Sequence, residues 1–304
     1  MKPDHTRNLI VDSNNIAHII RHAKVKTPKN LAHKETKVSE FIFKEMVDFI
    51  LSFAKQNNIN GIVIATEGKN IWRRDIYPEY KANRSPADDP YYENVKEAVG
   101  LLIEYFRDHT AAYVLNQPRA EADDIIAVWC QESSGVENVV LSSDKDFIQL
   151  INQRTFVYSP HVKDWLSTDD PCYDLFVKCI RGDRGDNIRS AYPRVREKVL
   201  GEAWNDKYKM LNLLETTLKD DTIVNENLKF NMKLIDLSSQ PEDIRTEIQN
   251  SIENYEPSKY SEADTLRFFG DLGFRDITKL IQYNDKPLKN SPVFKINKLS
   301  SKIL

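Results

Sequence analysis

In the first half of the chain, short apolar runs alternate with longer segments whose apolar residues recur at helical spacing. The short runs are continuous, as expected for strands that are buried on both faces; they lie at 8–12, 61–66, 111–115 and 138–143. The helix-period segments lie at 39–56, 93–109, 121–133 and 144–151. This alternation predicts an α/β unit with a mostly parallel sheet and helices on both faces.

After about residue 160 the strand pattern fades and helical periodicity takes over. The apolar spacing predicts helices at 171–182, 196–204, 206–219, 241–252 and 262–272. We therefore predict a sheet domain over 1–160 and a helical domain over 161–304. A length of 304 residues suits one large domain or two modest ones.

The composition is that of a globular protein with a sizeable core, since hydrophobic residues make up 40% of the chain. The cysteines Cys130, Cys172 and Cys179 form no CxxC pair, which favours free thiols in a reducing cytosol. No apolar run approaches the roughly 18 residues of a membrane span, and the N-terminus lacks an apolar signal segment. We expect a cytoplasmic, monomeric protein without a membrane anchor.

Nine acidic residues stand out because most of them follow or flank a strand-like run. They are Asp12, Glu67, Glu121, Asp123, Asp124, Asp144, Asp146, Asp183 and Asp186. Strand ends are where α/β folds build their sites, so we expect these side chains to meet at one edge of the sheet. Carboxylates that meet repel one another unless cations lie among them, and oxygen-only ligands suit Mg²⁺ or Mn²⁺ rather than zinc. The pattern predicts a hydrolase with two hard metal ions that acts on phosphodiesters.

The net charge of −3 at first argues against a nucleic-acid partner, but the distribution of charge favours one. Setting the nine candidate ligands aside leaves 37 acids against 43 lysines and arginines. A basic surface around an acidic, metal-filled centre is what a nuclease requires. The segment 72–92 adds a second signal, because it interleaves basic residues, Arg73 and Arg74 among them, with tyrosines and three prolines. It is either a long surface loop or a nucleic-acid contact.

Each acidic motif also has a plain structural interpretation. A strand-end acid such as Asp12 often caps a helix, the acids of EADD complement a helix dipole, and the glycines of GDRGDN suit an ordinary turn. The recurrence of such motifs at strand and helix edges favours the joint, functional interpretation. His18 and His22 stand four residues apart, but no third ligand accompanies them in the sequence, which favours a surface or core role.

The motifs IVDSNN, WRRDIYPEYKANR, EADD, LSSDKDF and IRGDRGDNI occur in this order between residues 8 and 200. Together they resemble the phage-type 5′-nucleases of the flap endonuclease superfamily, most of all the ribonuclease H branch found in T-even phages. The resemblance implies a PIN-like sheet domain and a helical arch at about 72–110 over the active site. It also implies a helix–three-turn–helix element in the helical domain that grips duplex DNA.

The resemblance implies two Mg²⁺ ions, for which Mn²⁺ is expected to substitute, and assigns the nine acids to them. The first ion would lie among Asp12, Glu67, Asp123 and Asp144, with Glu121 close by. The second would lie among Asp146, Asp183 and Asp186, with Asp124 nearby.

The YKxNR element within 72–92 receives roles from the same resemblance. Lys81 and Arg84 would be catalytic, adding positive charge at the scissile phosphate as negative charge builds there. Tyr80 would stack on a substrate base.

Two positions depart from the family's pattern. Glu67 stands where many relatives have Asp, and its longer arm keeps it within reach as a ligand. After GDRGDN the usual glycine-rich hairpin is replaced by IRSAYPRVREKVLG, which argues against a potassium-binding turn. Arg194, Arg196 and Lys198 of that segment remain as expected contacts to duplex phosphates.

The implied activity is that of a 5′→3′ exonuclease and flap endonuclease on RNA·DNA and duplex DNA, which removes RNA primers during lagging-strand replication. The implied partners are a single-stranded DNA-binding protein and a sliding clamp. Three other interpretations stay open. A PIN-type single-strand ribonuclease is usually shorter and lacks the GDxxDN element, a silent DNA-binding module would have lost several carboxylates, and a structural Ca²⁺ protein would show EF-hand spacing.

Overall fold

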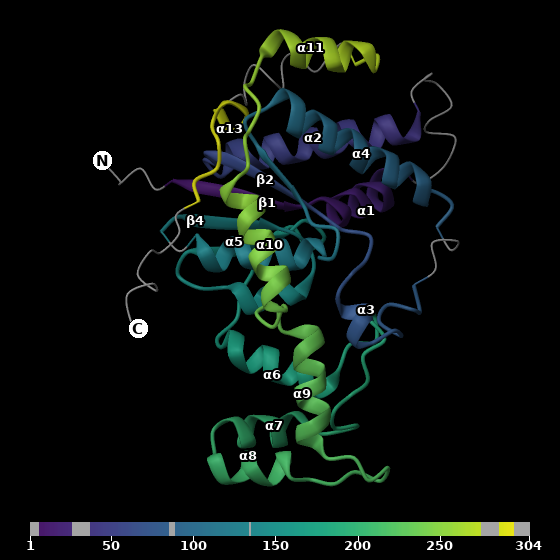
Figure 1. The fold of residues 1–304 in the computed structure, drawn as a ribbon, viewed down its shortest axis with the longest axis vertical. Coiled ribbons are helices and arrows are strands. Elements are labelled where there is room, and N and C mark those ends of the chain that lie inside the picture. The colour runs from purple at the N-terminus through teal and green to yellow at the C-terminus, as the bar shows by residue number, and fades with distance from the viewer. Residues whose placement is uncertain (1–5, 26–36, 85–88, 134, 275–285, 295–304) are drawn as a thin grey trace.

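A six-stranded sheet in the order β3–β2–β1–β4–β5–β6 forms the centre of the computed structural model, which describes residues 6–25, 37–84, 89–133, 135–274 and 286–294 (Figure 1). The strands are β1 Arg7–Asp12, β2 Gly61–Thr66, β3 Tyr113–Asn116, β4 Glu137–Leu141, β5 Thr155–Ser159 and β6 Asp164–Leu166. Strands β1 to β5 pair in parallel, and β6 is antiparallel to β5. The predicted mostly parallel α/β sheet is confirmed.

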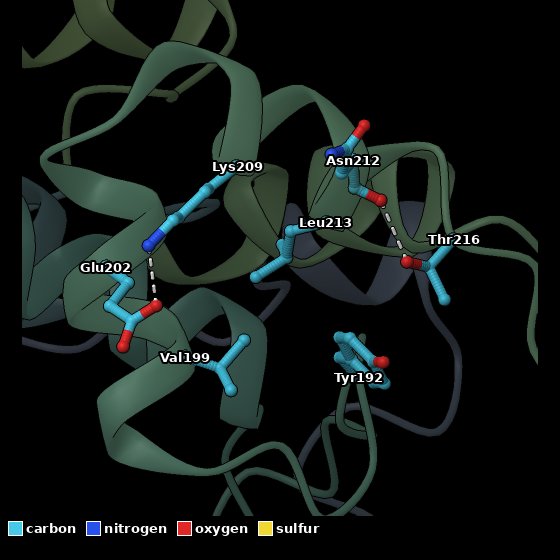
Figure 2. Close-up of a pocket in the computed structure, with 7 residues that line it drawn as sticks. All are labelled: Tyr192, Val199, Glu202, Lys209, Asn212, Leu213 and Thr216. Atoms are coloured by element: carbon cyan, nitrogen blue, oxygen red, sulfur yellow. Dashed lines mark hydrogen bonds and ion pairs between the residues drawn. The ribbon is translucent and has the colours of Figure 1, made fainter.

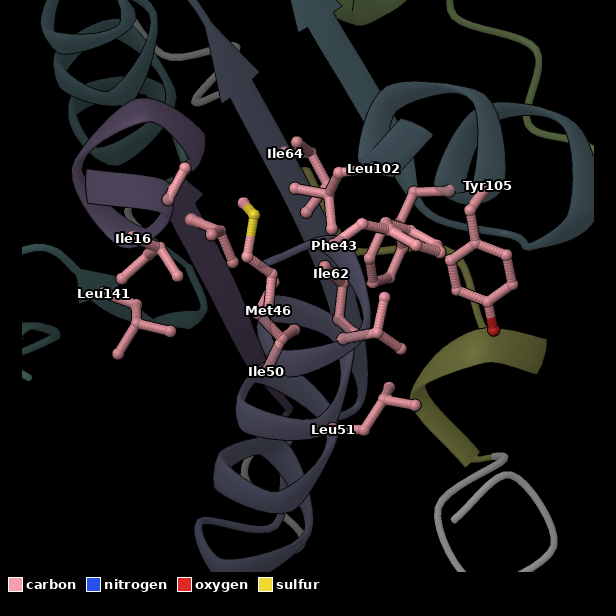
Figure 3. Packing of buried hydrophobic residues seen from close by; sticks show 14 of the residues in the cluster. Ile16, Phe43, Met46, Ile50, Leu51, Ile62, Ile64, Leu102, Tyr105 and Leu141 are labelled. Atoms are coloured by element: carbon pink, nitrogen blue, oxygen red, sulfur yellow. The ribbon is translucent and has the colours of Figure 1, made fainter. Parts of the chain in front are cut away.

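Different helices cover the two faces of the sheet, because successive residues of a buried strand point to opposite sides. Leu9 and Val11 of β1 belong to one apolar cluster, whereas Ile10 between them belongs to the other. The helices of the first cluster are α1 Ser13–Lys24, α2 Val38–Gln56 and α4 Tyr92–His109. The second face is covered by α5 Ala122–Glu132 and the 3₁₀ helix η3 Lys145–Leu150. Figure 3 shows side chains of α2 and α4 packed over the sheet in the first cluster.

A helical unit with its own apolar cluster follows the sheet. Its helices are α6 Pro171–Arg181, α7 Glu197–Trp204, α8 Lys207–Leu214 and α9 Val224–Ile235. Ile71 and Tyr80, from the segment after β2, are buried in the same cluster. That segment, which includes the short helix α3 Arg73–Ile76, therefore joins the strand ends of the sheet to the helical unit (Figure 1).

Beyond α9 the chain returns to the sheet, in contrast to the predicted boundary near residue 160. Ile244 and Ile248 of α10 Glu242–Glu253 are buried against α5, and α11 Glu262–Asp271 and α13 Lys286–Lys289 bury apolar side chains in the first cluster. Asn8 of β1 exchanges two hydrogen bonds with the backbone of Val293, at 2.9 and 3.0 Å. The apolar faces of these last helices cover the sheet rather than extend the helical unit.

The predicted arch at 72–110 is only partly set apart from the sheet. Helix α4 occupies 92–109 and buries Val95, Ala98 and Leu102 in the cluster that it shares with α2. It is therefore a covering helix of the sheet, and residues 85–88 lie outside the described part of the chain. The helix–three-turn–helix element stays a prediction. The described residues include no helix with the length and apolarity needed to cross a membrane.

Candidate active site

The ends of two central strands place the first two acids. The strand order reverses between β1 and β4, and in α/β sheets ligands bind outside the carboxyl ends of the strands at such a point. Asp12 is the last residue of β1, and Asp144 lies just beyond the end of β4. The hydroxyl of Ser142 donates to Asp12 Oδ2 at 2.9 Å and accepts from the backbone N–H of Asp144 at 3.1 Å. Ser142, which the sequence did not single out, thus links the carboxylate of Asp12 to the backbone of Asp144.

Asp12 is both a helix cap and a member of the acidic group. Its Oδ1 accepts the backbone N–H of Asn15 at 3.1 Å, and the Asn15 side chain in turn accepts the N–H of Ser143 at 2.9 Å. Burial raises the pKa of Asp12 to about 7, and the negative charges of Asp144 and Glu67 act in the same direction. The hydrogen bonds from protein donors offset this effect only in part.

Asp123, in the first turn of α5, faces the same two carboxylates. Burial raises its pKa well above the usual range for an aspartate, and the charges of Asp144 and Asp12 raise it further. Within the described part of the chain, no hydrogen bond to the Asp123 carboxylate is found. A half-buried carboxylate that faces two others without a protein donor is the strongest sign in this group that a cation belongs here.

Asp124, one residue further, is engaged by the protein itself. Arg73 donates to both of its oxygens, at 2.8 and 2.9 Å, and the Trp72 indole donates to it at 3.0 Å. The same guanidinium donates to Glu121 at 2.9 Å, and Arg73 is only 1% exposed. Arg73 was expected to contact nucleic acid, but the structure buries its side chain inside the protein. Asp124 is therefore the partner of an arginine rather than a free metal ligand.

Lys81 bridges Glu121 and the GDRGDN turn. Its backbone has a left-handed φ of 56°, uncommon for a residue with a side chain, and its N–H donates to the Asp186 carbonyl at 3.0 Å. The ammonium pairs with Glu121 and lies 3.9 Å from Asp186 Oδ2. Burial raises the pKa of Glu121, but Lys81 and Arg73 outweigh it, so the pKa of this carboxyl lies below its usual range.

Tyr80 lies inside this group rather than on its surface. Its hydroxyl is 2.9 Å from Glu121 Oε2 and 3.1 Å from Asp186 Oδ2, and the residue is 3% exposed. A ring buried in this way cannot stack on a base, so the structure gives Tyr80 a supporting position in place of the expected one. Arg84 is different, because its side chain is 57% exposed while it pairs with Asp186 at 2.5 Å.

A second acidic group forms around Lys178, in the last turn of α6. The ammonium of Lys178 pairs with Asp146 and lies 2.9 Å from Asp183 Oδ2. The other oxygen of Asp183 accepts the N–H of Gly185 at 2.7 Å. Gly182 opens this turn with φ of 70°, and a Cβ there would come within 2.5 Å of backbone oxygens that follow the turn. The sequence did not point to Lys178, because its partners lie in separate segments.

Glu67 lies at the rim of the first group, exposed to solvent just beyond β2. Burial of its carboxyl end and the charge of Glu121 raise its pKa, whereas Lys81 opposes the shift. The structure thus brings the acids together in two groups with lysine and arginine among them. The carboxylates of these groups stand wider apart than the ligands of a bound ion. Among the described residues, one set of three donor side chains has ligand atoms within 4.8 Å of one another, and that set lies outside both groups.

The other basic residues that the sequence singled out are exposed. Arg74 lies on α3, and Arg194, Arg196 and Lys198 lie before and at the start of α7.

A pocket between α7 and α8 lies close to these residues in the chain (Figure 2). It contains an ion pair between Lys209 and Glu202 at 2.7 Å, and none of the candidate metal ligands lines it.

Comparisons with known proteins place the chain among nucleases. The family model described as "5′-3′ exonuclease, N-terminal resolvase-like domain" matches residues 7–174. A DNA polymerase I of Streptococcus pneumoniae is 23% identical over 288 residues, which cover 88% of this chain and 32% of the polymerase. A 5′-3′ exonuclease of Mycoplasmopsis pulmonis is 24% identical over 192 residues, which cover 60% of each chain. The chain thus spans less than two thirds of the length of either relative.

Solved structures support the fold. The T5 5′-exonuclease with bound zinc superimposes with a TM-score of 0.64 at 20% identity, covering 81% of this chain and 98% of that one. A T5 flap endonuclease in a pseudo-enzyme-product complex with DNA and metal ions superimposes with a TM-score of 0.62. The closer likeness to the T-even ribonuclease H branch stays a prediction. Because the family model covers more than half of the sequence, the chain belongs to the 5′-3′ exonuclease family, through its N-terminal resolvase-like domain.

Proposed function

We propose that this protein is a Mg²⁺-dependent 5′→3′ exonuclease and flap endonuclease that hydrolyses phosphodiesters of RNA·DNA and duplex DNA. The observation that carries the proposal is the convergence of Asp12, Asp123 and Asp144 at the strand-order reversal, with raised pKa values and no protein cation pairing directly with Asp12 or Asp123 among the described contacts. Removal of RNA primers from the lagging strand, with a single-stranded DNA-binding protein and a sliding clamp as partners, belongs to the same proposal.

The donor set fits hard divalent cations. It consists of carboxylate oxygens, which suit Mg²⁺ and Mn²⁺, and it contains no thiolate or imidazole. The first group would hold one ion through Asp12, Asp123 and Asp144. The second would hold another through Asp146 and Asp183. Such ions, when bound, supply an activated water and stabilise the leaving oxygen of an in-line displacement.

The chain's own residues would orient and neutralise the phosphate. Lys81 is held by Glu121 and by its left-handed backbone, so its ammonium is fixed between the two acidic groups. Arg84 is tied to Asp186 but remains more than half exposed, which leaves guanidinium N–H groups free to reach a substrate phosphate. Both would add positive charge where negative charge builds during hydrolysis. Arg74, Arg194, Arg196 and Lys198 would contact duplex phosphates further away.

A cleavage assay with a 5′-labelled nicked RNA–DNA hybrid and a 5′-flap duplex tests the proposal. Both substrates should be cut with Mg²⁺ and left intact with EDTA, because the acids alone cannot activate water. Free single-stranded RNA of the same sequence should be cut much more slowly. Equal cutting of free RNA would instead identify a PIN-type single-strand ribonuclease.

Lys178 should compete with the second metal ion. Its ammonium occupies the space between Asp146 and Asp183, so Lys178→Met should leave two carboxylates in need of a cation and tighten binding of Mn²⁺ on the order of tenfold. Electron paramagnetic resonance titration with Mn²⁺ would measure this change. Lys198→Met, which removes an exposed lysine on α7, serves as the matched control and should leave affinity unchanged. Weaker Mn²⁺ binding by Lys178→Met would contradict the prediction.

A further inference from the structure

Outside the acidic groups, the structure completes a set of metal donors that the sequence left unfinished. His18 and His22 lie one turn apart on α1, with ring centroids 6.5 Å from each other. Asp89, from the segment just before α4, supplies a third donor, and one ligand atom from each of the three lies within 4.8 Å of the others. Among the described residues, these are the three donor side chains whose ligand atoms already lie close enough together to surround one ion.

The backbone and a neighbouring arginine hold these donors in place. Asp89 Oδ1 accepts the backbone N–H of Tyr91 at 2.9 Å, which fixes the carboxylate at the start of α4. The guanidinium of Arg21 pairs with Asp89, lies 2.8 Å from Nδ1 of His22 and stacks 4.9 Å from the centre of the Tyr91 ring. Two of the three donors therefore already share one cation, whose side chain is 13% exposed.

We propose that His18, His22 and Asp89 bind one Zn²⁺ ion or a similar borderline divalent transition metal, displacing the Arg21 guanidinium. Two imidazoles and a carboxylate are a zinc-type ligand set, with water at the fourth position. This distinguishes the site from the oxygen-only acids, which suit Mg²⁺. The ion would tie α1, whose cap is Asp12, to the segment that enters α4.

Isothermal titration with Zn²⁺ in excess Mg²⁺ tests the site, because Mg²⁺ then fills the oxygen-only positions. The wild-type protein should bind one Zn²⁺, and the midpoint of its thermal unfolding should rise. His22→Gln should weaken Zn²⁺ binding at least about tenfold and lose the rise. His22 is exposed, so its replacement leaves the core intact. His161→Gln, at an exposed histidine beyond β5, is the matched control and should behave as wild type.

Two more variants separate this site from its surroundings. Asp144→Asn, which alters the acidic group, should bind Zn²⁺ at this site as tightly as wild type. Arg21→Gln should bind Zn²⁺ more tightly, because it removes the competing cation. The proposal is overturned if no Zn²⁺ binds in excess Mg²⁺, if His22→Gln binds it as well as wild type, or if Arg21→Gln binds it more weakly.

Discussion

Asp144→Asn is expected to slow hydrolysis by about a thousandfold or more while substrate affinity stays nearly unchanged. Asp144 lies just beyond β4, where Ser142 links its backbone N–H to the carboxylate of Asp12. Metal-assisted charge stabilisation contributes several kcal/mol to such reactions, and about 1.4 kcal/mol corresponds to a tenfold change in rate. Binding depends on exposed phosphate contacts elsewhere, so it should survive. Single-turnover cleavage and a filter-binding titration would measure the two effects separately.

The asparagine keeps the shape of the site, so loss of activity would not reflect unfolding. Its side-chain oxygen can still accept the N–H of Asp146, as Asp144 does at 2.9 Å. Burial raises the pKa of Asp144 despite the nearby cations, so removing its charge should not destabilise the metal-free fold. Asp271→Asn, at an exposed position on α11, is the control for the same chemical change. Undiminished cleavage by Asp144→Asn would remove the central assignment.

Arg73→Met is expected to lower the free energy of unfolding by about 3–5 kcal/mol, the usual cost of removing one partner from a buried ion pair. Asp124 is fully buried and Glu121 is 3% exposed. Without Arg73, both carboxylates would keep their negative charge where solvent cannot stabilise it. Arg74→Met is a matched control, because its side chain is exposed on the same short helix and should change stability by less than about 0.5 kcal/mol. Urea unfolding at neutral pH would compare the two.

A double variant distinguishes charge from packing. Arg73→Met combined with Asp124→Leu removes the Arg73–Asp124 pair and leaves Glu121 paired with Lys81. Replacing a buried ion pair by apolar groups is often close to neutral. The double variant should therefore lose much less stability than the sum of the two single variants. If Arg73→Met proved as harmless as Arg74→Met, the buried pair would not contribute as described.

The sequence predicted four of the six strands of the sheet, β1 to β4, and most of the longer helices, but it missed β5 and β6 at one edge of the sheet. β1, β2 and β4 are continuous apolar runs, so their pattern is visible in a single sequence. Helix α1 was not predicted, because its first three residues are a serine and two asparagines, which favour caps and turns over helix interiors. β6 is three residues long and pairs only with β5, so its pattern is too short to read.

The acids were identifiable because strand ends are fixed by local patterns, whereas the direction of a basic or aromatic side chain is not. Nothing in WRRDIYPEYKANR distinguishes Arg73, which points into the protein, from Arg74, which does not. The difference comes from Glu121 and Asp124, which belong to a later helix. Lys178 was missed for the same reason, since Asp146 and Asp183 lie on either side of it in the chain. Such partners become visible only when the fold brings them together.

The contact between Asn8 and Val293 has a consequence for the order of events during synthesis. The first strand is translated before the rest of the sheet, but its side-chain amide acquires these two hydrogen bonds only after Val293 has been translated. Phe269 and Leu288, both fully buried against the sheet, also come from segments translated long after β1. The nascent sheet therefore remains partly uncovered until these later segments have been translated, and its folding cannot be completed when the strands alone have emerged.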